Sequence, residues 1–199
     1  MNCDFEEVIK KRRSIYDLGS YEVLSRTEIV KLVSEAVKYC PTAFNSQSGR
    51  VVILFGDEYQ KFWDMTESKL KTITSEKVFE KTKEKIQAFK NGLGTILFFE
   101  YKDVIKNLEE KFSLYKDNFQ IWAQQANGML QYIVWTALSE KGIGASLQHY
   151  NPLVDEEVYN IWGIPSHWHL VAQMPFGSIM KPAEEKEFEP LEMRVKVFQ

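Results

Sequence analysis

Cysteine and histidine are scarce in this chain of 199 residues. The two cysteines, Cys3 and Cys40, form no CxxC motif and no disulfide framework, so we expect both thiols to be free. We expect Cys40 to be a small buried apolar side chain and not a nucleophile. His167 and His169 would lie on one face of a strand, but no third ligand stands at a suitable spacing. A structural role is therefore favoured over a metal site.

Long apolar runs and an excess of positive charge are also absent. No uncharged apolar stretch approaches the roughly 18 residues that span a bilayer, and residues 1–7 contain acids where a secretory signal needs an apolar run. The sequence thus predicts a cytoplasmic protein without a membrane segment. Its 25 basic and 28 acidic side chains give a net charge of -3, which predicts no nucleic-acid partner. An anionic ligand must be held by a local cluster of cations.

Glycine and proline, at 10 and 6 residues, are too few for a collagen-like or low-complexity chain. The chain is 44% hydrophobic, and a chain of this size buries roughly 70% of its unfolded surface, so it can form a core without disulfides or metals. No internal repeat or linker divides it. We expect a single domain over residues 1–199.

Several familiar ligand-binding and nucleophile motifs are missing. Residues 142–147 have Leu147 where a dinucleotide fingerprint needs its third glycine, and they follow a helix instead of a strand. No GxxxxGK[ST] loop occurs, and no GxSxG elbow surrounds Ser46 or Ser48. These absences argue against Rossmann, P-loop and α/β-hydrolase chemistry.

Helix signals are distributed along the whole chain. Asp4 is expected to cap a first helix that ends at Arg12-Arg13-Ser14, and Ser25 with Glu28 forms a capping box for a second helix that ends before Pro41. Charged residues 57–91 are expected to be helical, and residues 118–140 to form the longest helix. That last segment is apolar around much of its circumference, as in a helix at the centre of a fold or in a dimer interface. Shorter helices are expected after caps at Asp103 and Asp155.

Short apolar or alternating runs between these helices predict strands. Because helices alternate with strands, the class is α/β or α+β with three layers. The predicted strands cover residues 51–55, 95–99, 145–149, 168–174 and 194–198.

Polar segments lie beside several of these predicted ends, and each has an ordinary explanation when taken singly. Adjacent arginines at 12 and 13 can compensate a helix dipole, and Asn45-Ser46-Gln47 is common turn chemistry. Arg194 can equally be a surface residue on an alternating strand.

Taken in order, these segments resemble the nitroreductase family of FMN-dependent oxidoreductases, most closely its short branch related to the fatty-acid-repression-mutant proteins. The resemblance runs from residue 12 to residue 198. It is carried by RRSIY (12–16), CPTAFNSQS (40–48), GMLQ (128–131), GASLQHYNP (144–152), MPFG (174–177) and RVKVF (194–198).

The resemblance implies an FMN site. It assigns the flavin phosphate and part of the ring edge to the first basic segment, where guanidinium groups suit a phosphate because they form bidentate bonds. It assigns Asn45 and Gln47 to the flavin ring and ribityl chain, since amides both donate and accept. The residues implied by the first segment are Arg12, Arg13, Ser14 and Tyr16.

The same resemblance places residues 146–149 beside the flavin N5, where a main-chain N–H would contact it. Arg194, with Lys196 second, is preferred to Lys181 as a further phosphate ligand. The chain lacks room for the helical lid of longer family members, so the segment 112–122 is the expected wall of the substrate pocket. The implied residues are Ser146, Leu147, Gln148, His149, Arg194 and Lys196 for FMN, and Phe112, Tyr115, Phe119 and Trp122 for the substrate.

The implied fold is a three-layer α/β (α+β) domain whose central mixed sheet is flanked by helices, in an intertwined homodimer with each FMN at the subunit interface. The implied activity is NAD(P)H-dependent reduction of nitroaromatic compounds or quinones, with ping-pong kinetics and a small aromatic oxidant. Because the flavin carries the redox chemistry, no catalytic side chain is expected. Two alternatives stay open: a flavin-binding sensor or regulator, and a flavin-free structural dimer.

Overall fold

The structure, a computed structural model, describes residues 4–199, so Cys3 lies outside the described part. Its helices are α1 (Phe5–Lys11), α2 (Arg26–Tyr39), α3 (Gly56–Ile73), α4 (Glu76–Lys90), α5 (Lys102–Lys111), α6 (Lys116–Glu140) and α7 (Asp155–Trp162). Its strands are β1 (Leu18–Gly19), β2 (Gly49–Phe55), β3 (Gly94–Tyr101), β4 (Ile143–Ala145) and β5 (Trp168–Ile179). Short 3-10 helices cover Ala43–Asn45 (η1), Ser113–Tyr115 (η2) and Leu191–Met193 (η3).

The strands form one sheet in the order β1-β5-β3-β2, with β4 also paired to β5. Each of these ladders is antiparallel; Val51 lies opposite Phe98, and Phe98 lies opposite Ala172. Within residues 4–199 the parallel component of the sheet is the isolated bridge between Ser14 and Ala145. The predicted α/β class with a central sheet is confirmed, and the sheet is less mixed than expected.

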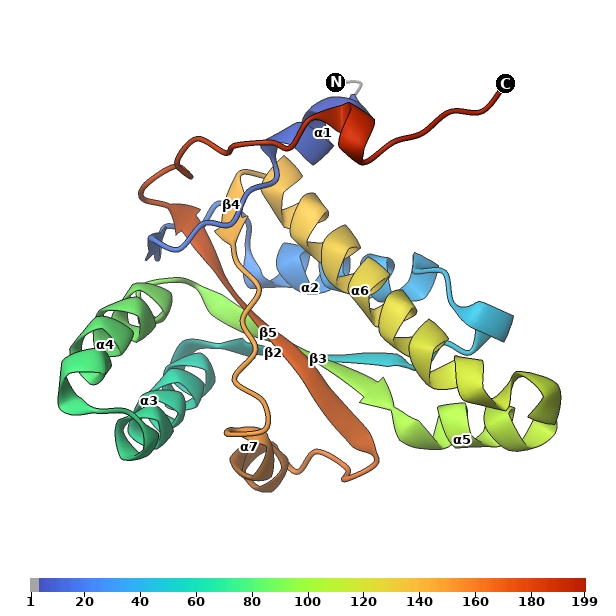
Figure 1. Cartoon of the computed structure of the whole chain (residues 1–199). Coiled ribbons are helices and arrows are strands. Elements are labelled where there is room, and N and C mark those ends of the chain that lie inside the picture. The colour runs from blue at the N-terminus through green and yellow to red at the C-terminus, as the bar shows by residue number, and fades with distance from the viewer. Residues whose placement is uncertain (1–3) are drawn as a thin grey trace.

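The side chains of β3 feed two cores, because successive residues of a strand point to opposite faces. Ile96 and Phe98 pack with residues of α2 and α6, whereas Leu97 and Phe99 pack with residues of α3, α4 and α7. Figure 1 shows the two helix layers on either side of the sheet. All four side chains are fully buried, and burial of each contributes about 1.5–3 kcal/mol. The predicted three layers are confirmed.

The longest helix, α6, crosses one face of the sheet and is apolar on both sides. Leu130 and Val134 pack into the core, whereas Ile121, Met129 and Tyr132 are 38–52% exposed. An apolar outward row of this kind is typical of a helix that is covered by another surface. Even so, none of the helices within residues 4–199 is both long and apolar enough to cross a membrane.

Some of the predicted N-cap residues are confirmed, and others are wrong. Asp4 caps α1, and Ser25 and Glu28 form the predicted reciprocal box at α2. The predicted caps at Asp103 and Asp155 are wrong, because each residue already lies in the first turn of its helix. Both carboxylates still interact favourably with the positive end of the helix dipole there.

One predicted strand is partly wrong and another is wrong. The strand expected at 145–149 is β4 only as far as Ala145; beyond it, Ser146 N donates to Pro175 O at 3.4 Å and Gln148 keeps an isolated bridge to Gln173. The segment 194–198 has no neighbouring strand within the described chain, and Val197 and Phe198 are 72% and 90% exposed. Residues 57–91 are two helices, α3 and α4, separated by extended residues at 74–75.

Candidate functional site

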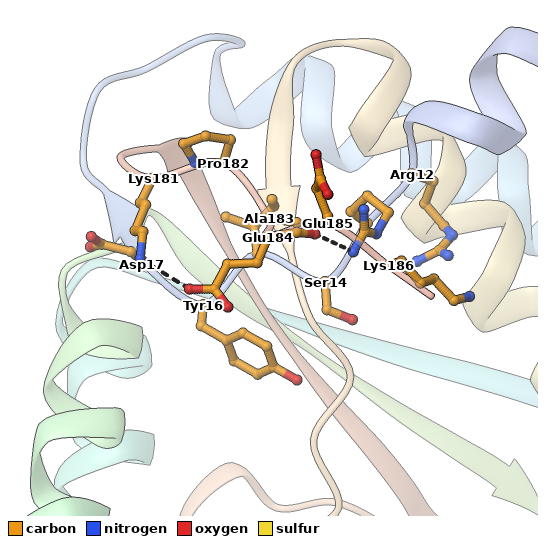
Figure 2. A pocket seen from close by; sticks show the side chains of 12 residues that line it. Arg12, Ser14, Tyr16, Asp17, Lys181, Pro182, Ala183, Glu184, Glu185 and Lys186 are labelled. Carbon is orange, nitrogen blue, oxygen red and sulfur yellow. Dashed lines mark hydrogen bonds and ion pairs between the residues drawn. The ribbon is translucent and has the colours of Figure 1, made fainter. Parts of the chain in front are cut away.

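A cavity of about 540 Å³ lies where the chain leaves α1. It is lined by residues 12–17 and 181–186, and Figure 2 shows the side chains of both segments around it. Its cations outnumber its carboxylates, so it is the local positive cluster that an anionic ligand needs in an acidic protein. The cations are Arg12, Arg13, Lys181 and Lys186, and the carboxylates are Asp17, Glu184 and Glu185.

The two arginines of this cavity differ in what they already bind. Arg13 Nη2 donates to the main-chain carbonyl of Glu184 at 2.7 Å. The Arg12 guanidinium stacks over Trp135, with its Cζ 4.3 Å from the ring centroid. Its buried Nε has no hydrogen-bond partner in residues 4–199. Because an unpaired buried donor is costly, Arg12 fits a phosphate that would accept from it.

The segment 146–149 runs beside this basic segment, since Ile15 N donates to Ala145 O at 2.9 Å. The side chains of Ser146 and Gln148 are buried and bond to each other at 3.1 Å, so they are not free for a ligand. The main-chain N–H groups of Leu147 and His149 donate to no acceptor in the described part of the chain. The geometry therefore favours main-chain contacts over side-chain contacts here.

The loop that carries the predicted amides is strained. Phe44, Asn45 and Gln47 have φ angles of 53°, 51° and 47°, whereas the other positive φ angles in residues 4–199 belong to glycines. Each such non-glycine residue costs about 1–3 kcal/mol, and strain of this kind gathers at binding sites. The side-chain amides of Asn45 and Gln47 are exposed and make no hydrogen bond within that range. They are available to a ligand.

The predicted substrate wall packs directly on this loop, through a residue that the sequence reasoning did not assign. The ring of Phe44 contacts Phe112, Tyr115, Phe119 and Trp122. Phe119 is only 1% exposed, so it supports the cluster from beneath instead of lining an open pocket.

The predicted residues form two half-sites in one chain. Arg12 stacks on Trp135 near the end of α6, whereas Phe44 stacks on Trp122 near its start. The two tryptophans are thirteen positions apart along the helix, which is roughly 20 Å. Arg194 and Lys196 belong to neither half-site, because they lie in the exposed C-terminal segment outside the lining of the cavity. Lys181 and Lys186 line it instead.

A buried carboxyl group lies beneath the amide loop. Glu100 is 7% exposed, its Oε2 accepts from Asn127 Nδ2 at 3.0 Å, and its Oε1 has no partner among residues 4–199. Burial raises the pKa of this carboxyl, and bonds from Ser48 and Asn127 and the charge of Arg50 oppose that rise. Nothing in the sequence marks Glu100, because its burial depends on α6 packing over the end of β3.

Replacement of this acid should make the protein more stable at neutral pH. With its pKa raised by folding, Glu100 binds a proton more tightly in the folded state, so its contribution to stability falls as pH rises from the unfolded pKa through the folded one. Glu100→Gln removes that loss, which amounts to about 1.4 kcal/mol for each pKa unit. Thermal unfolding between about pH 4 and 8 measures it, with exposed Glu110→Gln as the control. Parallel pH curves for wild type and Glu100→Gln would contradict this account.

The histidines and Cys40 show ordinary structural environments. The His167 ring stacks on Tyr101 at 4.8 Å, and burial lowers the pKa of His169. In the described part of the chain, no three His, Cys, Asp or Glu side chains are grouped to hold a metal ion. Cys40 packs against the core, and burial raises the pKa of its thiol.

Comparison with known proteins matches the model of the Nitroreductase family to residues 9–178. Nitroreductase FRM2 from Saccharomyces cerevisiae is 30% identical over 187 residues, 93% of this chain and 93% of that protein. The structure of nitroreductase CinD from Lactococcus lactis in complex with nicotinic acid is 46% identical, with a TM-score of 0.92 over 98% of this chain and 100% of that one. A nitroreductase with bound FMN from Desulfitobacterium hafniense is 17% identical and has a TM-score of 0.71 over all of both chains, which shows a shared fold.

Proposed function

This chain belongs to the nitroreductase family, a family of oxidoreductases, and we propose that it is an FMN-dependent NAD(P)H oxidoreductase that reduces nitroaromatic compounds or quinones. The observation that carries the proposal is the buried Nε of Arg12, which has no hydrogen-bond partner within residues 4–199, beside a cavity in which cations outnumber carboxylates. When bound, FMN would supply the redox chemistry, taking hydride from the nicotinamide and passing electrons to a small aromatic oxidant in ping-pong order. Support for such an oxidant comes from CinD, which has been solved in complex with 4-nitrophenol.

The residues of the chain bind and orient the cofactor in this proposal. Arg12 would hold the phosphate, and Arg13, Ser14 and Tyr16, which line the same cavity, would surround it. The main-chain N–H of Leu147, which has no acceptor within residues 4–199, would contact the flavin ring, next to its neighbours Ser146, Gln148 and His149. Arg194 and Lys196 remain proposed as further phosphate ligands that the C-terminal segment would bring in.

A homodimer is part of the proposal, because the two half-sites of one chain lie near different ends of α6. A second copy would bring Asn45 and Gln47 to the cavity that holds Arg12. The exposed apolar row of α6, which includes Ile121 and Met129, supports an interface along this helix. We expect this dimer to work in the cytoplasm.

The purified protein should be yellow and dimeric, and NADH or NADPH added without oxygen should bleach its visible band. An absorption spectrum and sedimentation velocity measure both properties on one sample. A colourless monomer that takes up no added FMN would contradict the function and the interface together. A yellow dimer without NAD(P)H turnover would favour a flavin-binding sensor or regulator, and a colourless dimer would favour a structural protein.

A further inference from the structure

One side chain of the amide loop, that of Phe44, packs on rings from a different part of the fold while 49% of its surface stays exposed. Phe44 lies between Ala43 and Asn45 in η1, and its four ring partners lie between the end of α5 and the second turn of α6. The ring centroids lie 4.8 Å from Phe112, 5.3 Å from Phe119, 5.9 Å from Tyr115 and 6.0 Å from Trp122. The ring thus ties the loop to the α5–α6 corner.

Hydrogen bonds inside the loop close two successive turns around Phe44. Asn45 N donates to Thr42 O at 3.1 Å, Ser46 N donates to Ala43 O at 3.1 Å, and Gln47 N donates to Thr42 Oγ1 at 3.0 Å. The φ of 53° at Phe44 is left-handed, and a non-glycine residue keeps such a conformation only when its surroundings hold it. The turn bonds hold the main chain of Phe44, and the four rings add contacts to its side chain.

We propose that Phe44 is a positioning residue whose ring, held in this aromatic cluster, fixes the amides of Asn45 and Gln47 in the conformation that contacts the cofactor. This inference rests on the proposed function, in which those amides contact the flavin. A loop ordered before binding loses less conformational entropy on binding, so the ring contributes to cofactor affinity without touching the cofactor. In this proposal the four rings predicted to line the substrate pocket serve mainly to anchor the amide loop.

The test compares Phe44→Ala with Phe44→Tyr, which keeps the ring, and with Leu114→Ala. Leu114 is 83% exposed in η2, between the ring partners, and is the matched control. In the protein freed of FMN, Phe44→Ala should speed amide hydrogen exchange at Asn45 and Gln47 by about tenfold or more, and it should weaken FMN binding about 10- to 100-fold. Phe44→Tyr and Leu114→Ala should match wild type in both measurements. Phe44→Leu, which keeps apolar volume, should be intermediate and serves if the alanine variant does not fold.

Different results overturn the proposal in distinguishable ways. Unchanged hydrogen exchange in Phe44→Ala would show that the ring does not hold the loop. A higher KM for aromatic oxidants with unchanged exchange and FMN affinity would make Phe44 a substrate contact instead. If exchange speeds up but Asn45→Ala binds FMN as tightly as wild type, the loop is not part of the FMN site, and the proposed function fails at this point together with the positioning role.

Discussion

Arg12→Ala should weaken FMN binding by about 10- to 150-fold and leave riboflavin binding nearly unchanged. The variant loses a charge-assisted bond to phosphate, which contributes about 1.5–3 kcal/mol. Riboflavin lacks the phosphate, so it never makes that bond. Fluorescence titration of both ligands against wild type and variant measures the difference directly.

Neighbouring cations provide the controls for this result. Arg13→Ala should have a smaller effect, because that guanidinium already donates to Glu184 O at 2.7 Å. Arg194→Ala tests whether the C-terminal segment also reaches the phosphate. Equal losses for FMN and riboflavin in Arg12→Ala would mean that Arg12 acts through its packing on Trp135 and not through the phosphate.

Local patterns were sufficient to predict most of the architecture. The three layers follow from the alternation of predicted helices and strands, and the Ser25–Glu28 box was predictable because helix capping is local chemistry. The two-residue strand β1 was missed because so short a run shows no alternation. The strand predicted at 194–198 failed because alternation shows a capacity to pair and cannot supply the partner strand.

Candidate site residues could be proposed from the sequence because they lie in short motifs, but the way the fold brings those motifs together could not. The family resemblance made Arg12, Asn45 and Gln47 candidates for the FMN site, but it could not show that they lie near different ends of α6. No local pattern distinguishes Arg12 from Arg13. The structure does, because Arg13 is bonded to Glu184, whereas the Arg12 Nε has no hydrogen-bond partner among the described residues. Phe44 carried no signal either, since its role depends on rings about 70 residues further along the chain.

The central claim is that each FMN site takes Arg12 from one chain and Asn45 from the other. Arg12→Ala and Asn45→Ala should each weaken FMN binding in every site of their homodimers, the second by about 1–3 kcal/mol for a lost amide bond. In a mixed dimer that contains one chain of each variant, the two FMN sites are not equivalent. One of its sites has both residues intact, and the other lacks both.

Mixed dimers, isolated through a different affinity tag on each variant chain, should therefore be titrated with FMN. The account predicts two phases, with half of the sites at wild-type affinity and half weaker than in either parent variant. A site built within a single chain would leave every site of the mixed dimer defective. A titration with no wild-type phase would contradict the claim that two chains share the site.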